Sequence, residues 1–356
     1  MQQEKVRIGF LDTLRAIAAL LVVYSHLVGM FAKENFLDIE LHRFVQKNFL
    51  GPLGLINDFG LLGVMVFFLI SGYIITHVAE RESRMDFALK RIFRIYPPLI
   101  VSVLIVAAVN AATSGATFPL SDYALSALLA NFFFVPLKLV NGVTWTLFIE
   151  VWFYLLMWTM MPLLKRGRYK TLSVALGLIG LLIVSEGRAH GDRIFAISAL
   201  LVYTPCLFMG QLLYFASTGK IGRKGFAILS FLMYLLLVKG MRKFYPGNVL
   251  PEQSYLMSFI ASYFIFTSFM FLDQRIGVPR SMSFFARISY SLYLVHAPVG
   301  YTAVSLLYER IGYYPALVAG FVLATLVSWL MHIYVEEPFR RMARNVTRSK
   351  AGEQAS

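Results

Sequence analysis

The chain has 356 residues, of which 58% are hydrophobic and only 15% charged, and its formal net charge is +14. This composition, with a mean hydropathy of +0.67, excludes an ordinary soluble domain and predicts a protein embedded in lipid. The basic residues flank apolar segments, which excludes a nucleic-acid-binding protein, and the single cysteine, Cys206, excludes disulfides and zinc clusters.

Apolar runs long enough to cross a bilayer recur along the chain. We predict about ten transmembrane helices, near residues 9–31, 59–79, 97–114, 145–164, 171–186, 194–216, 225–239, 254–272, 284–307 and 314–335. The apolar stretch 122–137 is short and interrupted, so we expect an interfacial or re-entrant segment there rather than an eleventh crossing.

The expected fold class is therefore an all-α, polytopic membrane bundle with no soluble domain. A membrane-embedded domain spans 1–340, and a short basic cytoplasmic tail follows at 341–356. With ten spans both termini share a side, and basic clusters fall on alternate loops at 81–94, 165–170, 220–224, 275–287 and 340–350. Because positive charge favours the inner side, we predict that these loops and both termini are cytoplasmic.

The first span carries three ionisable side chains, Asp12, Arg15 and His26. Each costs about 2.5–3.5 kcal/mol within a membrane, so each is a candidate functional group. At 100° per residue Arg15 and His26 lie within roughly 20° of one another, and His26 lies about 16 Å further along the helix. Asp12 and Arg15 can simply pair, and a neighbouring span can satisfy His26, but imidazole also suits a general base.

The second span, GVMVFFLISGYIITH, places Ser71 and Gly72 near its middle, where a small residue lets helices approach closely. We expect a packing role for Gly72 and a place near the pocket for Ser71. Before the third span, FALKRIFRIYPPL places Arg91 and Arg94 one turn apart on one cationic face. The pair is either an ordinary positive flank or a phosphate clamp, which guanidinium groups suit better than lysine.

The fourth span contains Glu150 within TWTLFIEVWFYLL, at a depth that resembles that of His26. A carboxylate beside an imidazole fixes the tautomer of the ring and stabilises its protonated form, so we predict that Glu150 orients His26. Alternatively, Glu150 is a packing carboxylate that Trp145, Thr146 or an arginine satisfies.

The ninth span contains ISYSLYLVHAPV, with Tyr290, Tyr293 and His296. We expect Tyr293 and His296 to line the pocket or support its residues, since His296 lies deeper toward mid-membrane than His26. We expect no metal site.

Together these runs resemble the acyltransferase family 3 membrane proteins, which O-acylate sugars of envelope glycans. The landmarks stand in family order: LDTLRAIAALLVVYSH, GVMVFFLISGYI, the arginine pair before IYPP, TWTLFIE, SYSLYLVHAP and VEEPFRR. Thr13 departs from the glycine that the family usually has there.

The resemblance implies a transferase that uses acetyl-CoA as acyl donor and a carbohydrate or lipid-linked glycan as acceptor, in the inner membrane of a bacterium. It implies that His26 is the catalytic base or acyl carrier with Arg15 as its motif partner, and that Arg91 and Arg94, with the adjacent Tyr96, bind the coenzyme A phosphates.

The competing interpretation is a transporter or flippase. In that case Asp12, Arg15, His26 and Glu150 form a proton or substrate relay within the membrane.

Overall fold

Among the residues that the computed structural model describes, which are 9–55, 59–113, 118–185, 191–245, 252–272 and 279–353, the regular structure is all helical. The elements are α1 (Gly9–Tyr24), η1 (Ser25–Met30), α2 (Phe31–Glu34), α3 (Glu40–Val45), η2 (Gln46–Leu50), α4 (Gly60–Arg81), α5 (Arg84–Thr113), α6 (Leu120–Ala127), η3 (Ala130–Phe133), α7 (Trp145–Lys165), α8 (Tyr169–Ser185), α9 (Asp192–Leu201), α10 (Thr204–Ser217), α11 (Arg223–Phe244), α12 (Glu252–Leu272), α13 (Arg280–Val295), η5 (His296–Tyr301), α14 (Thr302–Ile311), α15 (Tyr313–Met331), η6 (His332–Glu336) and α16 (Glu337–Glu353).

All ten predicted spans are helical, which confirms the all-α bundle. Within the described part of the chain, eight helices are long and apolar enough to cross a membrane. The other two predicted spans are α8, a shorter apolar helix, and the more polar helix that α13, η5 and α14 form together. The segment 122–137 holds only α6 and η3, of eight and four residues, so it does not cross.

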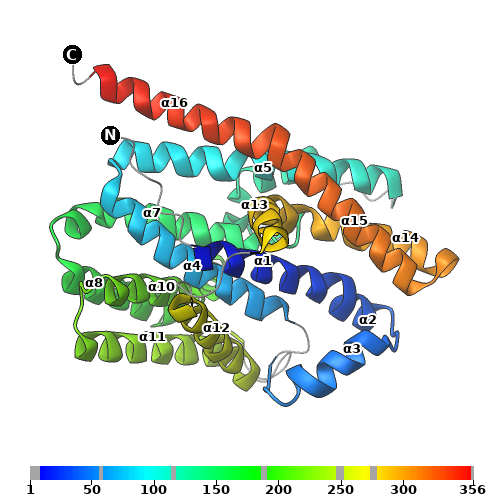
Figure 1. The fold of residues 1–356 in the computed structure, drawn as a ribbon, viewed down its shortest axis with the longest axis horizontal. Coiled ribbons are helices and arrows are strands. Elements are labelled where there is room, and N and C mark those ends of the chain that lie inside the picture. Colours follow the sequence, from blue (N-terminus) through cyan, green and yellow to red (C-terminus); the bar gives the residue numbers. More distant parts are fainter. Residues whose placement is uncertain are drawn as a thin grey trace.

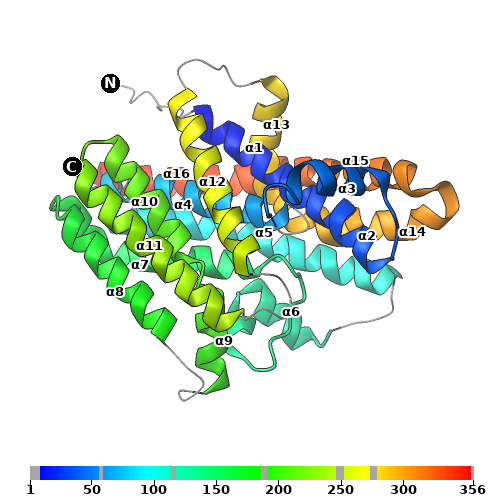
Figure 2. The same cartoon turned by 90° about the horizontal axis from the view of Figure 1, so that it is seen from below.

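Helix α4 lies in the middle of the bundle and packs against α1, α7, α10 and α12 (Figure 1, Figure 2). Its crossing with α10 is very close: a Cβ on Gly72 would lie 1.9 Å from the Leu207 carbonyl oxygen, and one on Gly210 would lie 2.2 Å from the Leu69 carbonyl oxygen. The two backbones can touch only because neither residue has a side chain. This geometry confirms the packing role predicted for Gly72.

Three of the long helices contain a π-helical segment beside a histidine. Segment η1 includes His26, η5 begins at His296, and η6 begins at His332. A π-helical turn holds an additional residue, which shifts the following side chains around the helix axis and is frequent at functional sites.

Side chains from distant parts of the chain satisfy backbone carbonyls at two of these segments. Pro298 has no N–H to donate to the Leu294 carbonyl four residues earlier, and Asn141 Nδ2 donates to that carbonyl instead at 3.0 Å. At η1 the hydroxyl of Tyr313 donates to the Leu27 carbonyl at 2.9 Å. Neighbouring elements therefore hold these two irregular turns in place.

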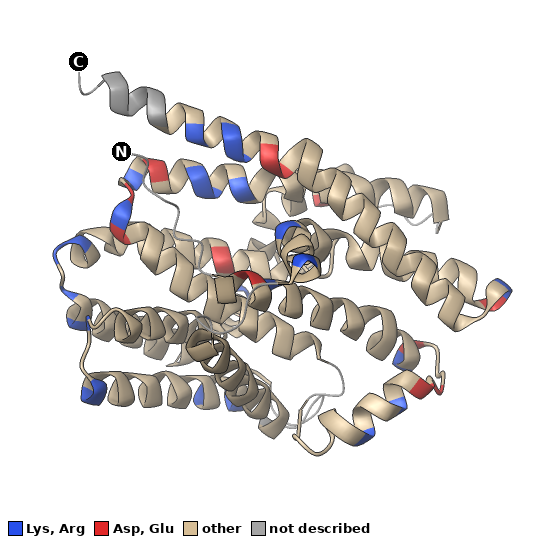
Figure 3. Cartoon of the chain, viewed as in Figure 1, with Lys and Arg blue, Asp and Glu red and all other residues tan. Residues whose placement is uncertain are grey.

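Most basic residues of the described loops gather at one end of the bundle, around the starts of α5, α8 and α11 and along α16 (Figure 3). Helix α16 continues from α15 and packs along α5, so much of the predicted tail at 341–356 is helical. The predicted basic cluster that begins at Arg275 lies partly outside the described residues, which resume at 279.

Candidate active site

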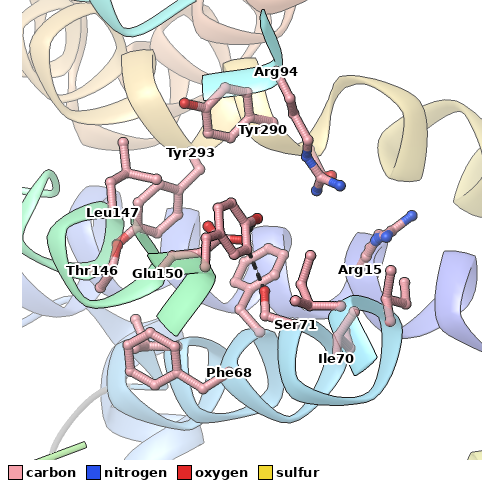
Figure 4. A pocket seen from close by; sticks show the side chains of 16 residues that line it. Arg15, Phe68, Ile70, Ser71, Arg94, Thr146, Leu147, Glu150, Tyr290 and Tyr293 are labelled. Atoms are coloured by element: carbon pink, nitrogen blue, oxygen red, sulfur yellow. Dashed lines mark hydrogen bonds between the residues drawn. The ribbon is translucent and has the colours of Figure 1, made fainter. Parts of the chain in front are cut away.

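A cavity with about 670 Å³ of empty space, open solvent included, lies between α1, α4, α5, α7 and α13 (Figure 4). Six residues singled out in the sequence line it: Arg15, Ser71, Arg94, Thr146, Glu150 and Tyr293. The wall is completed by Tyr154, Ser289 and Tyr290 and by apolar side chains that include Val64, Phe67, Phe68, Ile74 and Leu147. Polar groups from five separate helices thus converge on one space.

One end of the cavity is cationic. The guanidinium groups of Arg15, from α1, and Arg94, from α5, point toward one another there (Figure 4). Asp12 forms an ion pair with Arg15 at 3.5 Å, and Arg94 also interacts electrostatically with Glu150. Guanidinium N–H groups are well suited to phosphate, so this end offers a binding site for an anion.

Helix α16 brings a further cation to the same end. The rings of Phe93 and Phe339 lie 6.2 Å apart where α16 packs along α5, and the positive charge of Arg340 acts by like-charge repulsion on Arg15 and Arg94. Arg340 also lies 3.9 Å from Glu337 on its own helix.

Glu150 sits in mid-cavity, where it accepts hydrogen bonds from two hydroxyls. The donors are Ser71 Oγ at 2.9 Å and the hydroxyl of Tyr154, one turn along α7. The expected contact between Glu150 and His26 is not formed, because these hydroxyls are the partners of the carboxylate and a different residue contacts His26. Glu150 therefore organises the wall of the cavity rather than the histidine.

Tyr293 and Thr146 close the other end of the cavity. Thr146 Oγ1 donates to the Tyr293 hydroxyl at 2.8 Å, and that hydroxyl donates to the Val143 carbonyl at 3.2 Å. On its far side the Tyr293 ring lies 5.9 Å from the ring of His296, one turn further along the chain. Tyr293 thus stands between the cavity and the histidines.

His26 and His296 form a contacting pair, with ring centroids 4.7 Å apart and an angle of 73° between the rings. His26 Nδ1 lies 3.1 Å from His296 Nε2 and 3.0 Å from the Val22 carbonyl oxygen. His296 Nδ1 lies 3.0 Å from the Leu292 carbonyl oxygen, and its side chain is fully buried, whereas His26 keeps part of its surface exposed. This contact brings His296 against His26, and the supporting role expected for His296 stays a prediction.

Arg91 and Tyr96 lie outside the cavity. They line a separate apolar groove between α5 and α7, together with Phe87, Tyr154 and Trp158 among others. The Arg91 guanidinium stands 5.6 Å from the Phe87 ring, and neither Nε nor Nη1 has a hydrogen-bond partner among the described residues. Arg91 and Arg94 therefore face different spaces, not the single clamp expected from their spacing.

Trp145 also lies behind the wall rather than in it. Its ring packs 6.4 Å from Phe68, a lining residue, and 5.2 Å from Tyr203.

Sequence reasoning missed several residues of the site. Tyr154 lies four residues after Glu150 on the same helix face, so helical spacing could have found it. Tyr290 was noted in the polar run of the ninth span but was not assigned to the pocket, although it lies three residues before Tyr293 on the same helix. Asn141 lies in a loop, and no sequence signal linked it to the ninth span.

One family model, described as an acyltransferase domain, matches residues 8–333 of the chain. The comparisons with curated proteins and with solved structures found no match to the chain.

Proposed function

The chain belongs to acyltransferase family 3, and on that basis we propose that it moves an acyl group, most simply acetyl, from coenzyme A to a hydroxyl of an envelope carbohydrate. Membership itself makes the chain an acyltransferase with several membrane helices. The donor, the acceptor and the cellular location are proposed from the chemistry of the site.

The observation that supports this function best is the course of the cavity, from two arginines at one end to Tyr293 at the other, with the contacting pair of His26 and His296 behind it. Arg15 and Arg94 suit the phosphates of coenzyme A. The cavity then runs along α4 past Ser71 and Glu150 and offers a path for the pantetheine arm as far as Tyr293, whose ring separates the cavity from the histidine pair.

His26 is proposed as the general base. It accepts the proton of the acceptor hydroxyl, the hydroxyl oxygen attacks the thioester carbonyl, and the thiolate of coenzyme A leaves and recovers a proton. Arg15 lies about 16 Å from His26 along the helix, too far to stabilise the oxyanion at the reacting carbonyl. Arg15 and its partner Asp12 therefore belong to donor binding rather than to the chemical step.

The location follows from the distribution of charge. With both termini and the basic end of the bundle in the bacterial cytoplasm, the cationic end of the cavity would open toward cytosolic acetyl-CoA. An exopolysaccharide, an O-antigen or a lipid-linked glycan would approach His26 from the outer side of the inner membrane.

The transporter alternative requires a relay through Asp12, Arg15, Glu150 and His26. Glu150 and His26 have separate hydrogen-bond partners among the described residues, which favours the transferase over a relay that passes directly between them.

The direct test is release of free coenzyme A thiol by the purified protein in liposomes that contain acetyl-CoA and an envelope glycan fraction. We expect thiol to appear only when the glycan is present, and to disappear in a folded His26→Ala variant. Movement of the glycan across the bilayer without thiol release would instead establish transport.

A further inference from the structure

The contacts of the two histidines indicate which nitrogen of each ring carries the proton. His296 Nδ1 is 3.0 Å from the Leu292 carbonyl oxygen, and because a carbonyl can only accept, this nitrogen carries hydrogen. By the same argument His26 Nδ1, 3.0 Å from the Val22 carbonyl oxygen, carries hydrogen. In a neutral imidazole the other nitrogen, Nε2, is then an acceptor.

The contact between the rings fits this assignment. His26 Nδ1–H donates to His296 Nε2 over 3.1 Å and shares its hydrogen with the Val22 carbonyl. The opposite direction would require a second proton on the fully buried His296, and it would turn the lone pair of His26 Nδ1 toward a carbonyl oxygen. Donation therefore runs from His26 to His296 and from His296 to the Leu292 carbonyl.

We infer that His296 is a positioning residue that holds His26 in the one tautomer whose Nε2 can take a proton from the acceptor hydroxyl. This inference rests on the proposed function, in which His26 is the base. During transfer the hydroxyl O–H bond breaks and His26 Nε2–H forms, while the oxygen bonds to the acyl carbon and the C–S bond breaks. The departing thiolate then takes the proton from Nε2, which restores the neutral ring.

His296 does more than fix the tautomer. When His26 is protonated during the reaction, its Nδ1–H bond to His296 Nε2 becomes charge-assisted and stabilises the imidazolium. A carboxylate would do the same, as in hydrolase triads, but it would place a permanent second charge within the bilayer. A neutral imidazole acceptor avoids that cost.

The backbone supports this arrangement from both sides. The two histidines lie in η1 and η5, which pack against each other, and a side-chain donor satisfies a backbone carbonyl at each segment. Pro298 prevents η5 from closing as a regular helix, because it lacks an N–H. These contacts therefore fix the position of the His296 ring along the helix axis relative to His26.

The test compares two amide substitutions at His296. Gln can place its carbonyl oxygen where Nε2 of His296 lies, so His296→Gln keeps an acceptor for His26. Asn reaches only the position of Nδ1, so His296→Asn keeps the bond to Leu292 and loses that acceptor. We expect His296→Asn to lower kcat about 10- to 100-fold with the KM for acetyl-CoA unchanged, and His296→Gln to recover most of it.

His296→Leu provides a second loss variant, and His332→Gln a matched control at the third π-helical histidine, with kcat expected to stay near wild type. Two results would overturn the positioning role, provided that His26→Ala is inactive. One is a wild-type kcat in both His296→Asn and His296→Leu, and the other is an equal loss of kcat in His296→Gln and His296→Asn. If His26→Ala itself retains full kcat, the assignment of His26 as the base fails instead. If the wild-type protein releases no thiol in the presence of the glycan, the proposed function fails, so these failures are distinguishable.

Discussion

At the scale of single residues, Arg94 is held in the cavity by the way its own helix is built. Pro97 and Pro98 lie in the interior of α5 and interrupt its hydrogen bonds, and the Tyr290 hydroxyl donates to the Ile95 carbonyl at 2.9 Å. This bond ties α5 to α13 beside Arg94, so the guanidinium is directed toward Arg15 before any ligand binds. Such preorganisation reduces the entropy that binding must overcome.

Replacement of Arg94 tests the anion site. A charge-assisted hydrogen bond contributes about 1.5–3 kcal/mol, so Arg94→Ala should raise the KM for acetyl-CoA roughly 10- to 100-fold and change kcat little. Arg94→Lys keeps the positive charge but loses the paired N–H donors of the guanidinium group, so it should give an intermediate KM for acetyl-CoA. The exposed Arg166→Ala serves as control, and an unchanged KM in both Arg94 variants would remove the phosphate assignment.

The sequence predicted the members of the cavity better than their partners. Arg15, Ser71, Glu150 and Thr146 were identifiable because polar groups are costly inside a span. The partner of His26 was not identifiable from the sequence. The sequence gives the depth of a side chain in the membrane, but not which neighbouring helix that side chain faces. The wider turn that begins at Ser25 also changes the angle between Arg15 and His26 that was calculated for a regular α-helix.

At the scale of elements, the crossing of α4 and α10 fixes the back wall of the cavity. Ser71, which lines the cavity and donates to Glu150, is adjacent to Gly72, which touches α10. The position of Ser71 in the cavity wall therefore depends on how closely α4 approaches α10 at the adjacent Gly72.

We expect Gly72→Ala to destabilise the protein, because the added methyl group would lie 1.9 Å from a backbone oxygen. Overpacking typically costs about 1–3 kcal/mol, so the thermal unfolding midpoint in detergent should fall by several degrees. Gly225→Ala in α11, where a Cβ would meet nothing within 4 Å, should leave the midpoint unchanged or slightly raised. Equal midpoints for all three proteins would contradict the close crossing.

Helix positions were predictable from the sequence, whereas irregular turns within helices were not. Each predicted span is a run of apolar residues long enough to cross a bilayer. Such a run is helical because its backbone N–H and C=O groups can form hydrogen bonds only with each other within the lipid. The segments η1 and η5 depend on Tyr313 and Asn141, which are distant in the sequence. Only Pro298 gave a local signal of irregularity.

At the scale of the whole molecule, Lys and Arg gather mainly at one end of the bundle, although the other end carries some as well. The basic end carries the starts of α5, α8 and α11, and the other end carries α2 and α3 (Figure 3). The orientation proposed from this division sets the side from which each substrate enters.

Single-cysteine labelling tests that orientation, because the native Cys206 is fully buried and should react little. On intact cells a membrane-impermeant maleimide should label the exposed position of Lys47→Cys in η2 and leave Lys224→Cys in α11 unlabelled until the cells are lysed. The reverse pattern would place the cationic end of the cavity outside, away from cytosolic acetyl-CoA.

The most direct test of O-acylation is the ester content of the host's envelope polysaccharides, measured by mass spectrometry. The strains are wild type, a deletion, and the deletion complemented with wild-type protein or with His26→Ala of confirmed expression. We predict that one O-acyl ester is lost in the deletion, returns with the wild-type protein and stays absent with His26→Ala. An ester pattern identical in all four strains would contradict carbohydrate O-acylation by this protein.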